Sequence, residues 1–353
     1  MIFLFYYCLY VVLVPPFENP DETYHHENTF IVPPYEFDYT GDGNLFYYFQ
    51  KNVGQALGLS QVKFTLVGNN SFKYFTDSYR FKHPKYFVSE TGILKFRLLN
   101  LLYILPCIFV FLLYRANAKY FAMALALPGF AWFMTCINPD TLSIAIAMIV
   151  FCVIERQRFF LYLVLVFCFL FLDRTIILLI ISIIAADIYI AVFQKNKFLS
   201  VFFWVLFGLF LYLSNDFIKE NILSVDRDFR AIKSFVTMTF SFYGLLGPMA
   251  IKATYIEYAV FLLLVFLGMK NAFTTKSLDK KAIKEKTIML FYGVIWMYVL
   301  FLAPTIDHGR YFYPILFIII KSFWDSYPIS YNKILLIGFV TNTMMFIKLL
   351  IVY

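Results

Sequence analysis

Residues 1–30 read MIFLFYYCLYVVLVPPFENPDETYHHENTF, in which an uncharged apolar run gives way abruptly to a polar segment. Five ionisable side chains (Asp, Glu, His, His, Glu) lie within the seven residues from Asp21 to Glu27. Such groups are costly to desolvate at the end of a membrane helix, so a cluster of them there indicates function. We expect a site at a membrane surface that handles a charged or hydroxylated substrate.

The composition excludes an ordinary soluble protein. Of 353 residues, 61% are hydrophobic and 15% are charged, whereas soluble domains average about 25% charged residues. The net charge of +8 comes from basic residues scattered among short loops, which favours positive-inside topology over nucleic-acid binding. All five cysteines lie in or beside apolar runs, so neither a disulfide scaffold nor a metal site is expected from them.

Apolar runs that approach the length of a bilayer span recur along the chain. The first lacks a basic leader and a small-residue cleavage site, so we read it as a retained helix and not as a signal peptide. The sequence therefore predicts an all-α polytopic membrane protein, a single domain over 1–353 with about eleven transmembrane helices. The runs are 1–14, 95–113, 120–137, 141–154, 159–172, 175–193, 198–214, 253–269, 287–304, 311–323 and 334–352.

Basic residues in alternate loops set the predicted orientation. With the N-terminus inside, every short Lys/Arg-rich connection lies in the cytoplasm. The extracytoplasmic face then carries the loops 15–94 and 215–252, the NPD turn at 138–140, and TIDHGR at 305–310. All four histidines lie on that face, so we expect the chemistry to be extracytoplasmic, in a multi-pass protein of the inner (plasma) membrane.

The first extracytoplasmic loop, 15–94, is too long to be a simple connector. GNLFYYFQKNVGQAL (43–57) mixes apolar and polar residues at roughly helical spacing. This pattern predicts interfacial amphipathic helices that lie on the membrane. Gly-rich phosphate loops and zinc-ligand spacings are absent from the sequence.

Four short motifs occur in a specific order. They are PPFENPDETYHHE after the first run, NPDTLSIAIA at 138–147, SFYGLLG at 241–247 and HGRYFYPIL at 308–316. Together, over Pro15 to about Ile320, they resemble a bacterial polytopic membrane family of mostly unknown function that is grouped by fold with the GT-C glycosyltransferases. Asp21–Glu22 stand where that fold has its acidic residues, just after the first helix.

The resemblance implies transfer of a sugar from a polyprenyl-phosphate donor to an extracytoplasmic glycan or lipid acceptor, in cell-envelope polysaccharide synthesis. An inverting transfer needs a base within reach of the acceptor hydroxyl. Asp21 is our choice for that base. Glu22 or His25 would orient it or, with Asp21, hold a divalent cation (Mg or Mn), and Asp140 of the NPD turn would join them.

The leaving lipid phosphate favours a planar, permanently charged donor. Arg310 fits that role, with His308 and Tyr311 beside it in the sequence. Arg227, Arg230 and Lys233 of the second outer loop are further choices for steering or for phosphate contact.

Each candidate also has a purely structural reading. Asp21 and Glu22 suit the start of a short interfacial helix, and Asp140 suits an N-cap. His25 and His26 suit solvated interfacial positions, and Arg310 suits a snorkelling anchor.

Two other functions stay open at this stage. A transporter or flippase for a lipid-linked glycan would place ionisable groups at mid-membrane depth, and the predicted spans are nearly free of charge. A glycan polymerase or assembly subunit would share the outer-face site but take a lipid-linked oligosaccharide as donor.

Overall fold

The structure is a computed structural model, and it describes most but not all of the chain. Structural statements below refer to the described residues, which are 2–14, 22–31, 45–61, 66–68, 79–81, 91–114, 117–154, 174–193, 205, 241–246, 251–274, 280–302, 309–325 and 330–352. The predicted runs 159–172 and 198–214 lie outside them, apart from residue 205.

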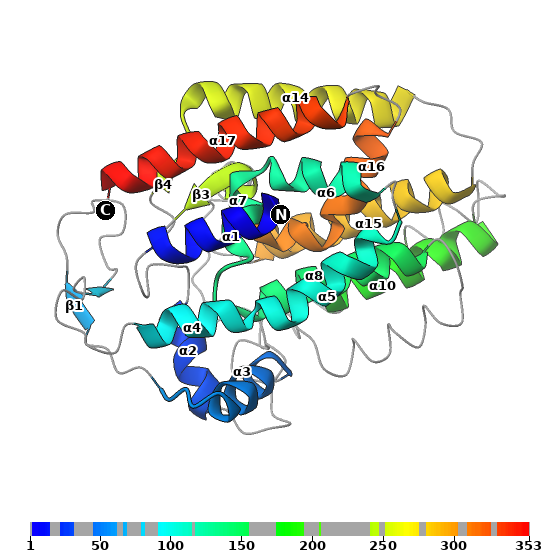
Figure 1. Cartoon of the computed structure of the whole chain (residues 1–353). Coiled ribbons are helices and arrows are strands. Elements are labelled where there is room, and N and C mark those ends of the chain that lie inside the picture. The colour runs from blue at the N-terminus through cyan, green and yellow to red at the C-terminus, as the bar shows by residue number, and fades with distance from the viewer. Residues whose placement is uncertain are drawn as a thin grey trace.

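Helices dominate the described residues (Figure 1). The N-terminal half holds α1 (Ile2–Leu13), α2 (Glu22–Ile31), α3 (Leu45–Ala56), α4 (Thr91–Leu99), α5 (Leu101–Leu112), α6 (Asn117–Leu125), α7 (Pro128–Phe133) and α8 (Pro139–Ile154). The C-terminal half holds α10 (Arg174–Ile188) with a π-helical end η1 (Tyr189–Phe193), α14 (Tyr255–Thr274), α15 (Lys280–Leu302), the 3-10 helix η2 (Gly309–Ile315), α16 (Leu316–Trp324) and α17 (Tyr331–Val352).

Within the described ranges, two short strand pairs interrupt the helical pattern. β1 (Leu66–Gly68) pairs antiparallel with β2 (Tyr79–Phe81), and β3 (Leu245–Leu246) pairs antiparallel with β4 (Ile251–Lys252). The prediction of an all-α protein missed them. Strands of two or three residues are too short to show the alternation by which a strand is recognised in a sequence.

Among the described residues, three helical stretches are long and apolar enough to cross a membrane: Gly92–Leu112 (α4 and α5 together), Tyr255–Ala272 in α14 and Tyr331–Ile351 in α17. Between 28% and 39% of each one is buried in the protein. Their outward surfaces carry large apolar side chains, such as Phe266 on α14 and Phe339 on α17. A chain that leaves so much apolar surface exposed is suited to lipid and not to water, which supports a membrane protein. Several shorter apolar helices accompany these three.

Ion pairs join helix ends that the sequence assigns to the same side of the membrane. Each pair brings together segments far apart in the chain. On the predicted cytoplasmic side the pairs are Asp187–Lys284 at 2.7 Å and Glu285–Lys321 at 2.6 Å; on the opposite side they are Glu257–Lys348 at 3.0 Å and Glu22–Arg97 at 2.7 Å.

The predicted run 120–137 is not one helix. Pro128 begins α7, because proline has no N–H to continue a helix and disfavours helical backbone in the residue before it. The carbonyls of Leu125 and Ala126, next to the break, accept hydrogen bonds of 2.9 Å from Asn342 Nδ2 and Thr341 Oγ1 of α17. Side chains of α17 therefore satisfy the backbone that the break leaves open.

The first outer loop contributes two of the helices. Figure 1 shows α2 running across α4, with α3 beside it, on the side of the molecule away from α14 and α17. α3 matches the predicted segment 43–57 closely. That these helices lie at the membrane interface stays a prediction.

Candidate functional site

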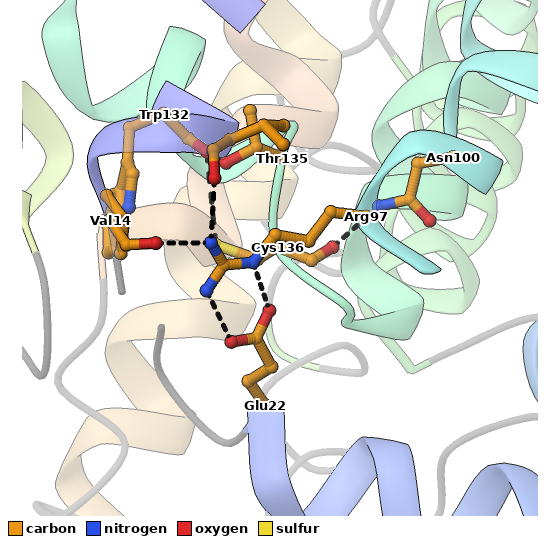
Figure 2. Close-up of polar contacts among 8 residues, drawn as sticks. Val14, Glu22, Arg97, Asn100, Trp132, Thr135 and Cys136 are labelled. Atoms are coloured by element: carbon orange, nitrogen blue, oxygen red, sulfur yellow. Dashed lines mark hydrogen bonds and ion pairs between the residues drawn. The ribbon is translucent and has the colours of Figure 1, made fainter. Parts of the chain in front are cut away.

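A buried ion pair ties the start of α2 to α4. Arg97 Nε donates to Glu22 Oε1 at 2.8 Å and Arg97 Nη2 donates to Oε2 at 2.7 Å, so the pair is bidentate (Figure 2). Both side chains are 0% exposed. Since the guanidinium engages both carboxylate oxygens, Glu22 is committed to this contact.

The same guanidinium closes the end of α1. Arg97 Nη1 donates to the carbonyl oxygens of Val14 at 2.5 Å and Val11 at 3.1 Å. The last carbonyls of a helix have no partner within it, and a cation stabilises that negative end of the helix dipole. The Tyr7 hydroxyl in turn donates to the Arg97 carbonyl at 2.5 Å. Arg97 thus fastens α1, α2 and α4 together where the first helix ends.

A second line of hydrogen bonds continues from α3 to the turn before α8. Gln50 Nε2 donates to Asn100 Oδ1 at 2.6 Å, and Asn100 Nδ2 donates to the Cys136 carbonyl at 2.8 Å. Asn100 is three residues beyond Arg97. The hydrogen bonds of Arg97 and those of Asn100 therefore both start near the junction of α4 and α5. Figure 2 shows Cys136 and its neighbours Trp132 and Thr135 packed around Arg97.

The NPD turn is capped by its asparagine. Asn138 Oδ1 accepts from the Asp140 backbone N–H at 2.9 Å, and Pro139 is the first residue of α8. The reading of Asp140 as an N-cap is therefore wrong: Asp140 lies in the first turn, where a carboxylate is favoured by the helix dipole. Asp140 is buried, with 7% of its surface exposed. The Thr141 hydroxyl fixes the turn further through hydrogen bonds with the Asn138 carbonyl and Tyr103 Oη.

Both histidines of α2 are buried, so their reading as solvated interfacial residues is wrong. His25 Nδ1 lies 2.7 Å from Tyr47 Oη of α3. His26 packs edge-on against the rings of Phe30 and Phe96. Burial lowers the pKa of His26 to about 4, although the nearby Glu22 opposes the shift, so His26 is neutral at pH 7.

The two later motifs meet each other. Tyr313 Oη of η2 donates to the Phe242 carbonyl at 3.1 Å. Tyr258 Oη of α14 donates to the Gly244 carbonyl at 3.0 Å. A Cβ at Gly129 would lie 2.6 Å from Tyr313 Oη and 3.0 Å from the Tyr243 carbonyl, so only glycine allows α7 to approach this closely. Residues 241–244, hereafter the SFYG segment, are therefore held between α7, η2 and α14.

Tyr311 has a packing role. Its ring stacks on Trp296 with centroids 4.9 Å apart and planes 12° apart, and its carbonyl accepts from the Tyr292 hydroxyl. Tyr311 is 4% exposed, and its role as a substrate-binding residue stays a prediction. The backbone of Arg310 lies in η2, and its side chain is outside the described part of the structure.

Contacts connect all four motif segments. Hydrogen bonds lead from Glu22 of α2 through Arg97 and Asn100 to the Cys136 carbonyl, two residues before the NPD turn. α8 and α7 both pack against η2, which holds the SFYG segment. Four stretches that are widely spaced in the sequence thus form one continuous region.

The predicted cation is not supported by Glu22 and His25. Arg97 holds both Glu22 oxygens, and a metal beside a guanidinium would meet its positive charge. Among the described residues, no group of three His, Cys, Asp or Glu side chains is placed to hold a metal. Asp21, Arg227, Arg230, Lys233 and His308 lie outside the described ranges.

Arg97, Asn100 and Gln50 were not among the residues predicted from the sequence to be functional. The signal was available for Arg97, which falls inside the predicted span 95–113, where an ionisable residue is a candidate functional residue by default. No family model, curated protein or solved structure matches the chain.

Proposed function

We propose that the chain is a membrane glycosyltransferase of the GT-C kind. It moves a sugar from a polyprenyl-phosphate donor to a glycan or lipid acceptor on the extracytoplasmic face, within cell-envelope polysaccharide synthesis. The observation that carries the proposal is the meeting of the four motif segments in one region of a helical membrane protein. The arrangement of about eleven spans and the inner-membrane location are parts of the same proposal.

Asp21 is the proposed general base. It accepts the proton of the acceptor hydroxyl while that oxygen attacks the anomeric carbon, and the bonding pair of the anomeric C–O bond leaves with the polyprenyl phosphate. Asp140 is the second acid, which orients the acceptor or stabilises positive charge that develops on the sugar ring. No step is assigned to a metal ion.

Glu22 is a positioning residue in this scheme. Its bidentate contact with Arg97 holds the first turn of α2 against α1 and α4, and Asp21 is the next residue along the chain. A base must be held within hydrogen-bond reach of the proton that it removes. We propose that the buried Glu22–Arg97 pair keeps Asp21 in that position.

Arg310 is the proposed contact for the departing phosphate. Its planar guanidinium suits the charge that develops on the leaving group. η2, which carries the Arg310 backbone, is anchored to the SFYG segment through Tyr313 and packs against α8. His308, Arg227 and Arg230 are proposed to assist in binding the donor.

The ion pairs that join different helices disfavour coupled transport. Asp187 ends α10 and pairs with Lys284 near the start of α15, and Glu257 in the first turn of α14 pairs with Lys348 near the end of α17. A proton- or ion-coupled transporter needs ionisable groups at mid-depth that change partners. These described groups lie near helix ends and are neutralised by fixed partners.

The test uses the purified chain in proteoliposomes with farnesyl-phosphate-linked glucose, mannose and galactose as donors. Wild-type protein is expected to release farnesyl phosphate and transfer the sugar. Asp21→Asn should abolish transfer, Asp140→Asn should lower it at least tenfold, and Asp187→Asn, at the opposite end of the helices, should leave it unchanged. All three variants should elute as the wild type in detergent.

Full activity of Asp21→Asn would remove Asp21 from the mechanism. Transfer from a lipid-linked oligosaccharide, with none from the single-sugar donors, would favour the polymerase. Movement of the intact lipid-linked glycan across the bilayer without transfer would favour the flippase.

A further inference from the structure

Two buried amide side chains beside the NPD turn keep hydrogen-bonding capacity that no described residue uses. Gln50 is 0% exposed and Asn138 is 1% exposed. Gln50 Oε1 and Asn138 Nδ2 have no hydrogen-bond partner within the described structure. Buried polar atoms nearly always have a partner in a folded protein, so these two atoms require a water or a ligand group as partner.

The orientation of Gln50 is fixed by its neighbours. The Cys136 carbonyl can only accept, so the Asn100 atom that faces it is the donor Nδ2. Asn100 Oδ1 then faces Gln50 and requires the donor Nε2 there. The atom of Gln50 left over is the acceptor Oε1.

The orientation of Asn138 is fixed in the same way. The Asp140 backbone N–H can only donate, so the atom that caps α8 is Oδ1. The atom of Asn138 left over is the donor Nδ2. The two amides thus offer one acceptor and one donor.

Hydrogen bonds lead from Gln50 to the segment that carries Asn138. Gln50 is linked through Asn100 to the Cys136 carbonyl, two residues before Asn138, and α3 packs against α8. A hydroxyl both donates and accepts, so it matches this pair. A charged group does not, because a buried charge needs a partner of its own and Arg97 of this region is already neutralised by Glu22.

We propose that Gln50 and Asn138 form a subsite that binds one hydroxyl group of the transferred sugar, and that this sugar is an uncharged hexose. The inference rests on the proposed function and names the chemical class of its donor. Gln50 Oε1 accepts from the hydroxyl and Asn138 Nδ2 donates to it.

The experiment measures how tightly the wild type and three variants bind farnesyl-phosphate-linked glucose, mannose and galactose. The monodeoxy analogues of these sugars are tested in the same way, by calorimetry in detergent. Asn138→Ser keeps a good N-cap and removes Nδ2. Gln50→Met keeps the length of the side chain and removes both polar atoms. Asn342→Ser is the matched control, because protein atoms use both ends of that amide: Tyr10 Oη donates to it and the Leu125 carbonyl accepts from it.

For the hexose that binds best, loss of one particular hydroxyl should weaken binding to the wild type about tenfold, as for a single neutral hydrogen bond. Asn138→Ser and Gln50→Met should bind the full sugar about tenfold more weakly and should lose nothing further with that deoxy analogue. Asn342→Ser should lower Tm but keep the wild-type binding pattern. Farnesyl phosphate glucuronic acid should bind more weakly than the hexose.

If removing the sugar hydroxyl weakens binding equally in the wild type, Asn138→Ser and Gln50→Met, the subsite proposal is wrong. This is the result expected if the two amides bind only water. The glycosyltransferase proposal would remain intact. Tighter binding of the glucuronic acid donor would overturn the preference for an uncharged sugar. Failure of the wild type to bind any farnesyl-phosphate sugar would remove both the subsite and the proposed function.

Discussion

Arg97 and Glu22 are 75 positions apart in the sequence and meet as a bidentate ion pair that is fully buried. Neither residue has solvent to replace its partner, so the pair is a fixed joint between α2 and α4. Arg97 also caps the end of α1, which makes this joint the meeting point of three helices.

Breaking this joint should destabilise the protein strongly. Glu22→Gln leaves a buried guanidinium uncompensated, so we expect a loss of about 3–5 kcal/mol in the free energy of unfolding. Denaturant unfolding in detergent micelles, followed by tryptophan fluorescence, measures it. The partly exposed pair Asp187–Lys284 is the control, and Asp187→Asn should lose no more than about 1 kcal/mol.

The double variant Glu22→Gln/Arg97→Gln separates charge from packing. It should recover part of the loss of Glu22→Gln, because no uncompensated charge remains. If the stability loss of the double variant equals the sum of the losses of Glu22→Gln and Arg97→Gln, the two side chains do not stabilise the protein as a pair.

The approach of α7 to the SFYG segment predicts a steric effect at Gly129. Gly129→Ala places a methyl group against Tyr313 Oη and the Tyr243 carbonyl, so we expect a loss of about 1–3 kcal/mol, measured by the same unfolding assay. Gly293→Ala is the control: its Cβ would meet nothing within 4 Å, and alanine should stabilise α15 by up to about 1 kcal/mol.

Removing the Tyr313 hydroxyl should relieve part of that strain. Tyr313→Phe in the Gly129→Ala background deletes the atom 2.6 Å from the added methyl group, so its own cost should be smaller there than in the wild type. Equal costs in both backgrounds would place the strain elsewhere.

The buried His26 predicts a stability that depends on pH. The pKa of His26 is about 4 in the folded state against 6.5 in the unfolded state, so between these values the unfolded state binds a proton that the folded state does not. Stability should therefore rise from pH 4 to 6.5 and be lost as the pH falls through that range. The contribution is at most about 3 kcal/mol.

Thermal unfolding of wild type and His26→Phe between pH 4 and 7.5 measures this contribution. Phenylalanine keeps the packing against Phe30 and Phe96 and does not titrate. The difference between the two curves should follow the titration of His26. Parallel curves would mean that His26 titrates alike in the folded and unfolded states.

The site requires that α2 and η2 open to the same face. Single cysteines at positions 21 and 310, in a background with the five native cysteines replaced by alanine, should react with an impermeant maleimide added outside intact cells. A cysteine at position 276, in the predicted cytoplasmic Lys-rich loop, should react only after lysis. Labelling of 21 and 310 from opposite sides would end the glycosyltransferase proposal.

Much of the helical structure could be predicted from the sequence. The runs 1–14, 141–154, 175–193, 253–269, 287–304, 311–323 and 334–352 each correspond to helical segments in the structure. The run 95–113 became α4 and α5, and 120–137 was broken at Pro128. Apolar runs of this length report local burial in lipid or protein, and that property is written in consecutive residues.

The candidate site was predicted only in part. The motif segments around Glu22, Asp140 and Tyr311 were identified, and the structure brings their elements into one region. The predicted role of Glu22 as a metal ligand is not supported, because Arg97, which is remote in the sequence, holds both carboxylate oxygens. A single sequence does not reveal which charges pair across such a distance.

The sequence by itself determined that this protein is helical, apolar and suited to a membrane, and that its polar motifs follow the predicted outer ends of its helices. Only the tertiary structure decided which polar groups are already used. It committed Glu22 to Arg97, buried both histidines of α2, and left Gln50 Oε1 and Asn138 Nδ2 without partners in the described structure. The physical reason is that helix formation and apolar burial depend on neighbouring residues, whereas hydrogen bonds and ion pairs depend on which helices pack together.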